Sequence, residues 1–225
     1  TDRINEEDAL LPSSKLCPEA PCFTFRDIFR SMIHFVKILA YPFLPEGQDP
    51  HPYLEQLTTQ IVDPPSLHLG EYLPLTPTVF CSPLRRAREM LAVRPDQKLR
   101  ILPELREVPF SFVSLCTPEE WSTQANVIVR RRFKEAFIQD RLLVTRRVLE
   151  QEIRTVLALA AEEDPCTCIS HSFRLKLIEA FLKAEGELFR VPERIHEVFP
   201  DDQETYAWGT GFTVTQTEMQ RSLGP

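Results

Sequence analysis

Three short segments place an arginine, a glutamate and a histidine just after expected β-strands. They are Ser82-Pro83-Leu84-Arg85-Arg86-Ala87, Leu105-Arg106-Glu107 and Ser170-His171-Ser172. Because ligands of open α/β sheets collect beyond the carboxyl ends of the strands, polar residues at these junctions are the first candidates for a site. Arginine grips phosphoryl oxygens, histidine donates hydrogen bonds to them, and a protonated carboxylic acid can give a proton to a leaving alcohol. Together the segments predict a site for a phosphate monoester.

Each of these residues also has an ordinary interpretation. Arg86 alone would be a charge on a helix surface, Glu107 a solvated acid in a loop, and His171 a hydrogen-bonded residue at a strand end. Structural groups of these kinds far outnumber catalytic ones. The joint placement of the three residues, rather than any one of them, favours a functional site.

The elements that must position these residues alternate between strands and helices. Expected strands cover residues 21–25, 78–81, 98–102, 166–170 and 208–215. Expected helices cover about 27–41, 53–62, 82–93, 140–161 and 173–187, with a short helix near Trp121. This alternation predicts an α/β fold with a mostly parallel sheet and helices on both faces.

Three of the expected helices depend on particular patterns. The helix over 27–41 has Asp27 as its N-cap and apolar residues at helical spacing, namely Ile28, Phe29, Met32, Ile33, Val36 and Leu39. The helix after residue 81 depends on Ser82-Pro83, an N-cap followed by a proline at the first helical position. The short helix near Trp121 begins with the capping box Thr117-Pro118-Glu119-Glu120.

The domain organisation follows from the distribution of polar residues and proline. Residues 1–20 are polar and form an expected extension, and residues 21–225 form one expected domain. Within it, residues 42–77 carry many of the 20 prolines and are expected to form a Pro-rich insertion over the surface.

The three site segments resemble motifs of the histidine phosphatase superfamily, which includes cofactor-dependent phosphoglycerate mutases and many acid and protein phosphatases. The first is similar to the family's Ser-Pro-Leu-x-Arg-Ala, the second to Leu-x-Glu, and the third to Ser-His-Gly, with Ser172 in place of the glycine. The resemblance covers about residues 78–215. It implies a histidine-phosphatase-like fold in which Arg86 binds the phosphoryl group, Glu107 donates a proton and His171 stabilises the transferring phosphate.

Family enzymes also begin with a strand that ends in Arg-His-Gly, whose histidine attacks phosphorus, and this chain contains no Arg-His pair. In one explanation, residues 22–25 replace that strand, Arg26 joins the phosphate-binding residues, and Asp27 stands where the nucleophile should be. In the other, Arg-His-Gly precedes Thr1, which would leave the sheet without a central strand. The first is favoured, because removing a buried strand exposes unpaired backbone groups and apolar area.

These observations predict a catalytically impaired protein that keeps a remnant phosphate pocket. It would serve as a binding or assembly module for phosphate or a phosphorylated ligand, with protein partners in a larger complex. The alternative is an active phosphomonoesterase that acts through phosphohistidine, with its nucleophile motif upstream of this chain. Glu107 and His171 would then be catalytic.

Composition narrows the classes of ligand and environment. The net charge of -7 disfavours a nucleic-acid partner, which needs clustered positive charge. No apolar run approaches the ~20 residues of a membrane span, so the chain is expected to be soluble. The six cysteines have no zinc-site spacing, so neither a metal nor another cofactor is expected. Three of them lie in apolar strands, which favours a reducing intracellular compartment.

Overall fold

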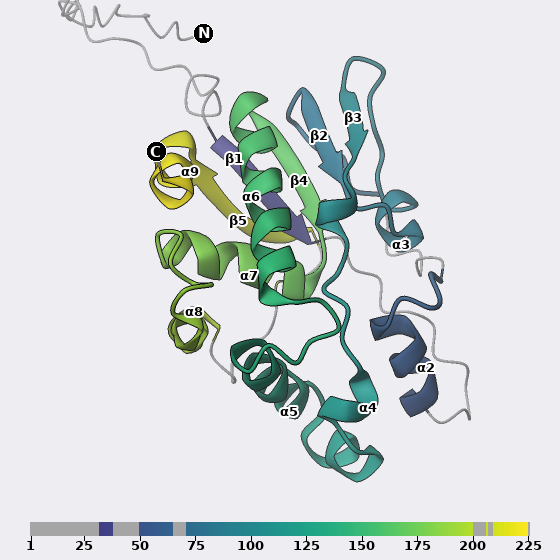
Figure 1. Ribbon diagram of the computed structural model, residues 1–225. Helices are drawn as coiled ribbons and strands as arrows, with labels where there is room; N and C mark the ends of the chain where they lie inside the picture. Colours follow the sequence, from purple (N-terminus) through teal and green to yellow (C-terminus); the bar gives the residue numbers. More distant parts are fainter. Residues whose placement is uncertain (1–31, 38–49, 65–70, 200–205, 207–208, 225) are drawn as a thin grey trace, which may run out of the picture.

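A five-stranded sheet organises the computed structural model, which describes residues 32–37, 50–64, 71–199, 206 and 209–224 (Figure 1). The strands are β1 (Met32–Lys37), β2 (Thr78–Cys81), β3 (Lys98–Ile101), β4 (Cys166–Ser170) and β5 (Thr210–Thr215). Their order across the sheet is β3-β2-β4-β1-β5. The first four run parallel to their neighbours, and β5 pairs antiparallel with β1. The predicted α/β class with a mostly parallel sheet is therefore confirmed.

Strand β1 corrects the predicted helix over 27–41. Residues 32–37 pair with β4 on one side and with β5 on the other. Ile33 and Phe35 are fully buried and Val36 is nearly so. A strand covered on both faces carries apolar residues at nearly every position, so its pattern can be mistaken for that of a buried helix. The expected strand at 21–25, together with Arg26 and Asp27, lies outside the described residues.

The two faces of the sheet are covered unequally in the described part of the chain. Phe80 of β2 belongs to the larger core cluster, which includes residues of helices α5 (Pro118–Ile138), α6 (Arg146–Glu162), α7 (Ser172–Lys183) and α9 (Gln216–Leu223). Its neighbours Val79 and Cys81 point to the other face, where they pack with Ala87 of helix α3 (Arg85–Arg88) and with Met90. Figure 1 shows α6 lying across the sheet.

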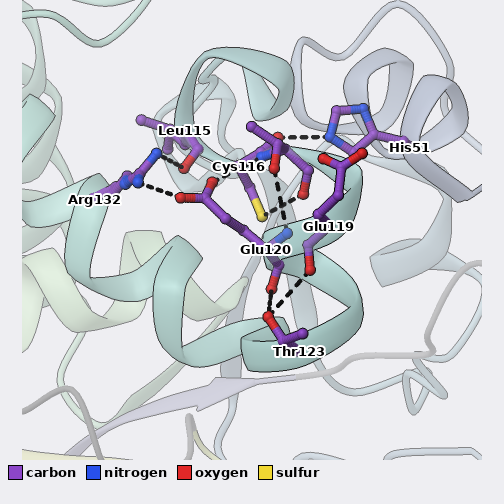
Figure 2. A network of polar contacts seen from close by, with 8 residues as sticks. His51, Leu115, Cys116, Glu119, Glu120, Thr123 and Arg132 are labelled. Atoms are coloured by element: carbon purple, nitrogen blue, oxygen red, sulfur yellow. Dashed lines mark hydrogen bonds and ion pairs between the residues drawn. The ribbon is translucent and has the colours of Figure 1, made fainter.

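A group of helices lies beyond the carboxyl ends of the parallel strands (Figure 1). It consists of α2 (Pro50–Thr58), α4 (Phe112–Leu115) and α5, and part of it falls in the expected Pro-rich insertion. His51 ties α2 to the α4–α5 junction through a 2.6 Å hydrogen bond between its Nε2 and the Cys116 carbonyl oxygen (Figure 2). Arg132 of α5 binds the same junction from the other side through the Glu120 carboxylate and the Leu115 carbonyl.

Most predicted elements exist, but several have different bounds. Strands 78–81 and 166–170 match, and the capping box of Thr117 and Glu120 is present. The helix that follows this box, predicted to be short, has 21 residues. The helix predicted over 82–93 is only four residues long, and its N-cap is Leu84 rather than Ser82.

Two expectations drawn from composition bear on the described residues. Cys81, Cys166 and Cys168 are free and buried, as their apolar surroundings predicted, whereas Cys17 and Cys22 lie outside the described part. Within the described ranges, no helix combines the length and the apolar character that crossing a membrane requires.

Candidate functional site

Ser82 and His171 join the carboxyl ends of β2 and β4. Ser82 follows β2 and His171 follows β4, and the Ser82 Oγ lies 2.8 Å from the His171 Nε2. Both residues are buried. The Ser82 backbone N–H donates to the Ile169 carbonyl at 3.0 Å, so the two strand ends are also joined through the main chain. The ends of the two strands therefore position this pair without a bound ligand.

Ser82 occupies one ring nitrogen of His171. The Leu84 backbone N–H donates to Ser82 Oγ at 3.3 Å, and Ser82 Oγ and His171 Nε2 share a hydrogen bond in which either group can be the donor. Burial, followed by the positive charges of Arg86, Arg174 and Lys37, holds the pKa of His171 well below its usual value. The imidazole is therefore neutral, with its one proton on either Nδ1 or Nε2. This Nδ1 is buried and has no hydrogen-bond partner among the described residues.

Arg86 supplies a second buried nitrogen without a hydrogen-bond partner. The residue lies on α3 and is 5% exposed, and its Nη1 makes no hydrogen bond within the described chain. Among the described residues its nearest counter-ion is Asp63, whose Oδ1 lies 3.7 Å from Nη1. Burial lowers the pKa of Arg86, while the charges of Glu107, Asp63 and Tyr53 oppose that shift. The guanidinium is thus close to carboxylates but not bonded to one through Nη1.

Glu107 is held at the start of α7, directly beside His171. Its Oε1 accepts from the backbone N–H groups of Val108 and Arg174, both at 2.9 Å, and its Oε2 accepts from Phe173 at 3.3 Å. The bonds from Phe173 and Arg174 satisfy free N–H groups of the first turn of α7, so Glu107 acts as a helix-capping residue. Burial raises the pKa of Glu107, against the opposing effect of these bonds and of Arg86.

Lys37 brings a further cation to the site from the end of β1. Its side chain is 5% exposed, and Nζ donates to the Tyr206 carbonyl oxygen at 2.5 Å. The charge of Lys37 lowers the pKa of His171, so the ammonium lies close enough to the imidazole to act on it electrostatically. No sequence motif marks Lys37, which falls inside the segment expected to form a helix.

The structure gathers Arg86, Glu107 and His171 at the carboxyl edge of the sheet. Arg86 and Glu107 each shift the pKa of the other, and Arg86 lowers the pKa of His171. Glu107 also accepts the backbone N–H of Arg174, three residues after His171. Arg26 cannot be placed, since it lies outside the described residues. The site also includes Ser82, which was expected to cap a helix, and Asp63, which lies in the Pro-rich insertion and has no motif to mark it.

Hydrogen bonds and an ion pair connect the residues around the site. Arg174 is buried on α7, with its Nε donating to the Arg106 carbonyl at 2.9 Å and its Nη2 2.7 Å from the Glu152 carboxylate. Ser170 donates from Oγ to the Leu105 carbonyl at 2.7 Å, which fastens β4 to the 3-10 helix η2 (Pro103–Leu105). In the described part of the chain, no group of three or more His, Cys, Asp or Glu side chains is arranged to hold a metal ion.

Comparison of the chain with protein-family models, with curated proteins and with solved structures found no match in any of the three. The function therefore has to be inferred from the geometry of these residues. That geometry offers buried cations and unpartnered buried nitrogens at one strand edge. Such groups can bind an oxyanion.

Proposed function

We propose that this protein is a binding module for phosphate or a phosphorylated ligand, built on a histidine-phosphatase-like fold and unable to turn its ligand over. The observation that carries the proposal is the pair of buried nitrogens, Arg86 Nη1 and His171 Nδ1, neither of which has a hydrogen-bond partner in the described chain. Leaving a buried donor unpaired costs about 1–3 kcal/mol. An oxyanion bound between the two would satisfy both.

The residues would divide the work of binding. The guanidinium of Arg86 would bind phosphoryl oxygens through charge-assisted hydrogen bonds, and the Nδ1–H of His171 would donate one more. Lys37 would add positive charge. Ser82 would act as a positioning residue, since its hydroxyl occupies His171 Nε2 and leaves Nδ1 for the ligand.

The same geometry argues against phosphoryl transfer. The sequence continues from Lys37 at the end of β1 with Ile38, which has no nucleophilic atom. Ser82 has a hydroxyl beside a histidine, but cationic neighbours and burial lower the pKa of His171 and make it a poor base.

The proposal is tested by titrating the 225-residue chain with inorganic phosphate, monitored by NMR or calorimetry. We expect saturable binding that weakens at least tenfold in Arg86→Gln. Arg85→Gln is the matched control, because Arg85 is the adjacent arginine and points to solvent beside Glu89. Equal affinity in the two variants would contradict the assignment of Arg86.

Hydrolysis of an aryl phosphate is measured on the same proteins. We expect the wild-type rate to equal that of His171→Gln. Turnover that disappears in His171→Gln would instead support the alternative, an active phosphomonoesterase.

A further inference from the structure

Asp63 lies beside Arg86 without saturating it. Its Oδ2 accepts the backbone N–H of Arg85 at 2.7 Å, and its Oδ1 lies 3.7 Å from Arg86 Nη1. That nitrogen makes no hydrogen bond to the carboxylate or to any other described atom. Asp63 therefore contributes negative charge at the donor while leaving the donor free to bind a ligand.

The negative charge of Asp63 is less compensated than that of Glu107, the other carboxylate near Arg86. Glu107 accepts three backbone N–H groups, two of them at the start of α7. Asp63 accepts one, and 36% of its side chain is exposed. Apart from Arg86 itself, only one backbone N–H offsets the negative field of Asp63 that a ligand at Arg86 would meet.

The distances set the strength of this effect. A ligand oxygen bonded to Arg86 Nη1 at the usual ~2.8 Å would lie no more than about 6.5 Å from Asp63 Oδ1. At that separation and an effective dielectric constant of about 40, each unit of negative charge on the ligand weakens binding roughly tenfold. A doubly charged ligand meets this penalty twice.

We propose that Asp63 determines which charge state of ligand the site accepts, favouring a singly charged phosphoryl group, as in a phosphodiester, over a doubly charged monoester. This inference rests on the proposed binding function. It makes Asp63 a specificity-determining residue, although no sequence motif marks it.

The test compares two ligands that differ in charge: dimethyl phosphate, a monoanion, and methyl phosphate, which is doubly charged at pH 8. Their affinities are measured by NMR titration at low ionic strength for the wild-type chain and for Asp63→Asn. Asparagine keeps an oxygen that can accept the Arg85 N–H. Asp96→Asn is the control, because Asp96 is an exposed acid that pairs with Arg94 away from Arg86.

We expect the wild-type chain to bind dimethyl phosphate at least as tightly as methyl phosphate. In Asp63→Asn, the affinity ratio should shift about tenfold toward methyl phosphate, with no shift in Asp96→Asn. Asp63→Ser, which also keeps an oxygen acceptor, replaces Asp63→Asn if the latter does not fold.

Three results would overturn this inference. A wild-type chain that prefers methyl phosphate tenfold would contradict it without any variant. An unchanged ratio in both Asp63 variants would refute the role of Asp63 and leave the proposed function intact. Failure of both ligands, and of inorganic phosphate, to bind any of the proteins would refute the proposed function itself.

Discussion

His171 lies in a buried position where desolvation and neighbouring charge act in the same direction. Burial favours the neutral imidazole, and the cations Arg86, Arg174 and Lys37 favour it further. In the proposed binding mode this neutral histidine accepts the Ser82 O–H at Nε2 and donates to the ligand through Nδ1. The same residue therefore suits oxyanion binding and makes a poor general base.

The depressed pKa of His171 predicts a pH dependence of stability. The unfolded chain protonates this histidine near pH 6.5, while the folded chain resists protonation, so stability is full above pH 6.5 and falls as the pH drops. The slope should approach about 1.4 kcal/mol per pH unit below that point. We expect His171→Gln to remove this slope between pH 6.5 and 5 in urea unfolding.

Glu107 contributes with the opposite sign. Its pKa is raised on folding, so its contribution is lost as the pH rises above 4.5. Because wild type and His171→Gln both contain Glu107, the difference between them isolates the histidine. His196→Gln, at an exposed position of helix α8 (Ile195–Val198), should keep the wild-type slope. A constant difference between wild type and His171→Gln across the range would contradict the assigned charge state.

The sequence could identify the site residues that follow recognisable strands. Arg86, Glu107 and His171 each come just after an apolar run that does form a strand or the turn beyond one. Lys37 and Asp63 could not be found this way. Lys37 ends a strand with a helix-like pattern, and Asp63 reaches Arg86 only through the path of the chain after α2.

Strand β1 is the element for which the spacing of apolar residues predicted the wrong type of secondary structure. The apolar residues of 28–39 recur at helical spacing, yet Ile33, Phe35 and Val36 are all buried in a strand that lies between β4 and β5 inside the sheet. Pairing with β4 and β5 decides the conformation, and that pairing joins residues more than 100 positions apart. Local patterns carry no information about it.

The pairing of β1 with β5 predicts a severe effect of Gly211→Ala. Gly211 lies opposite Val36, and a Cβ at this position would collide with the Phe35 carbonyl oxygen. The strands would have to separate, and we expect a loss of 1–3 kcal/mol or more in chemical denaturation, on the order of overpacked sites. Thr213→Ala, at an exposed position of the same strand, should cost less than about 1 kcal/mol. Similar losses in both variants would argue against the β1–β5 register.

The helices beyond the strand ends depend on His51. Its ring packs edge-on against Phe112, with centroids 5.1 Å apart, and its Nε2 bonds the Cys116 carbonyl (Figure 2). His51→Phe keeps the ring and leaves the buried carbonyl without a donor, so we expect a loss of about 1–3 kcal/mol in unfolding free energy. His196→Phe, at an exposed position, should change stability by less than about 0.5 kcal/mol. A neutral His51→Phe would show that α2 is held mainly by other contacts.

The whole chain is negatively charged, whereas positive charges gather around His171 at the carboxyl edge of the sheet. The chain carries a net charge of -7, yet Lys37, Arg86 and Arg174 all lower the pKa of one histidine at one edge of the sheet. Parallel strands bring their carboxyl ends to the same edge, so residues from β1, β2 and β4 meet there. The net charge of the chain gives no hint of this cationic site, which only the order of the strands in the sheet reveals.

The most direct test of the central claim is a crystal structure of the protein soaked in phosphate. We predict one phosphate within hydrogen-bond distance of both Arg86 Nη1 and His171 Nδ1, with the Ser82–His171 bond retained and no covalent bond to phosphorus. Phosphate bound only elsewhere, or no phosphate at saturating concentration, would contradict the binding claim. Density joining phosphorus to a side chain would contradict the claim that the site lacks a nucleophile.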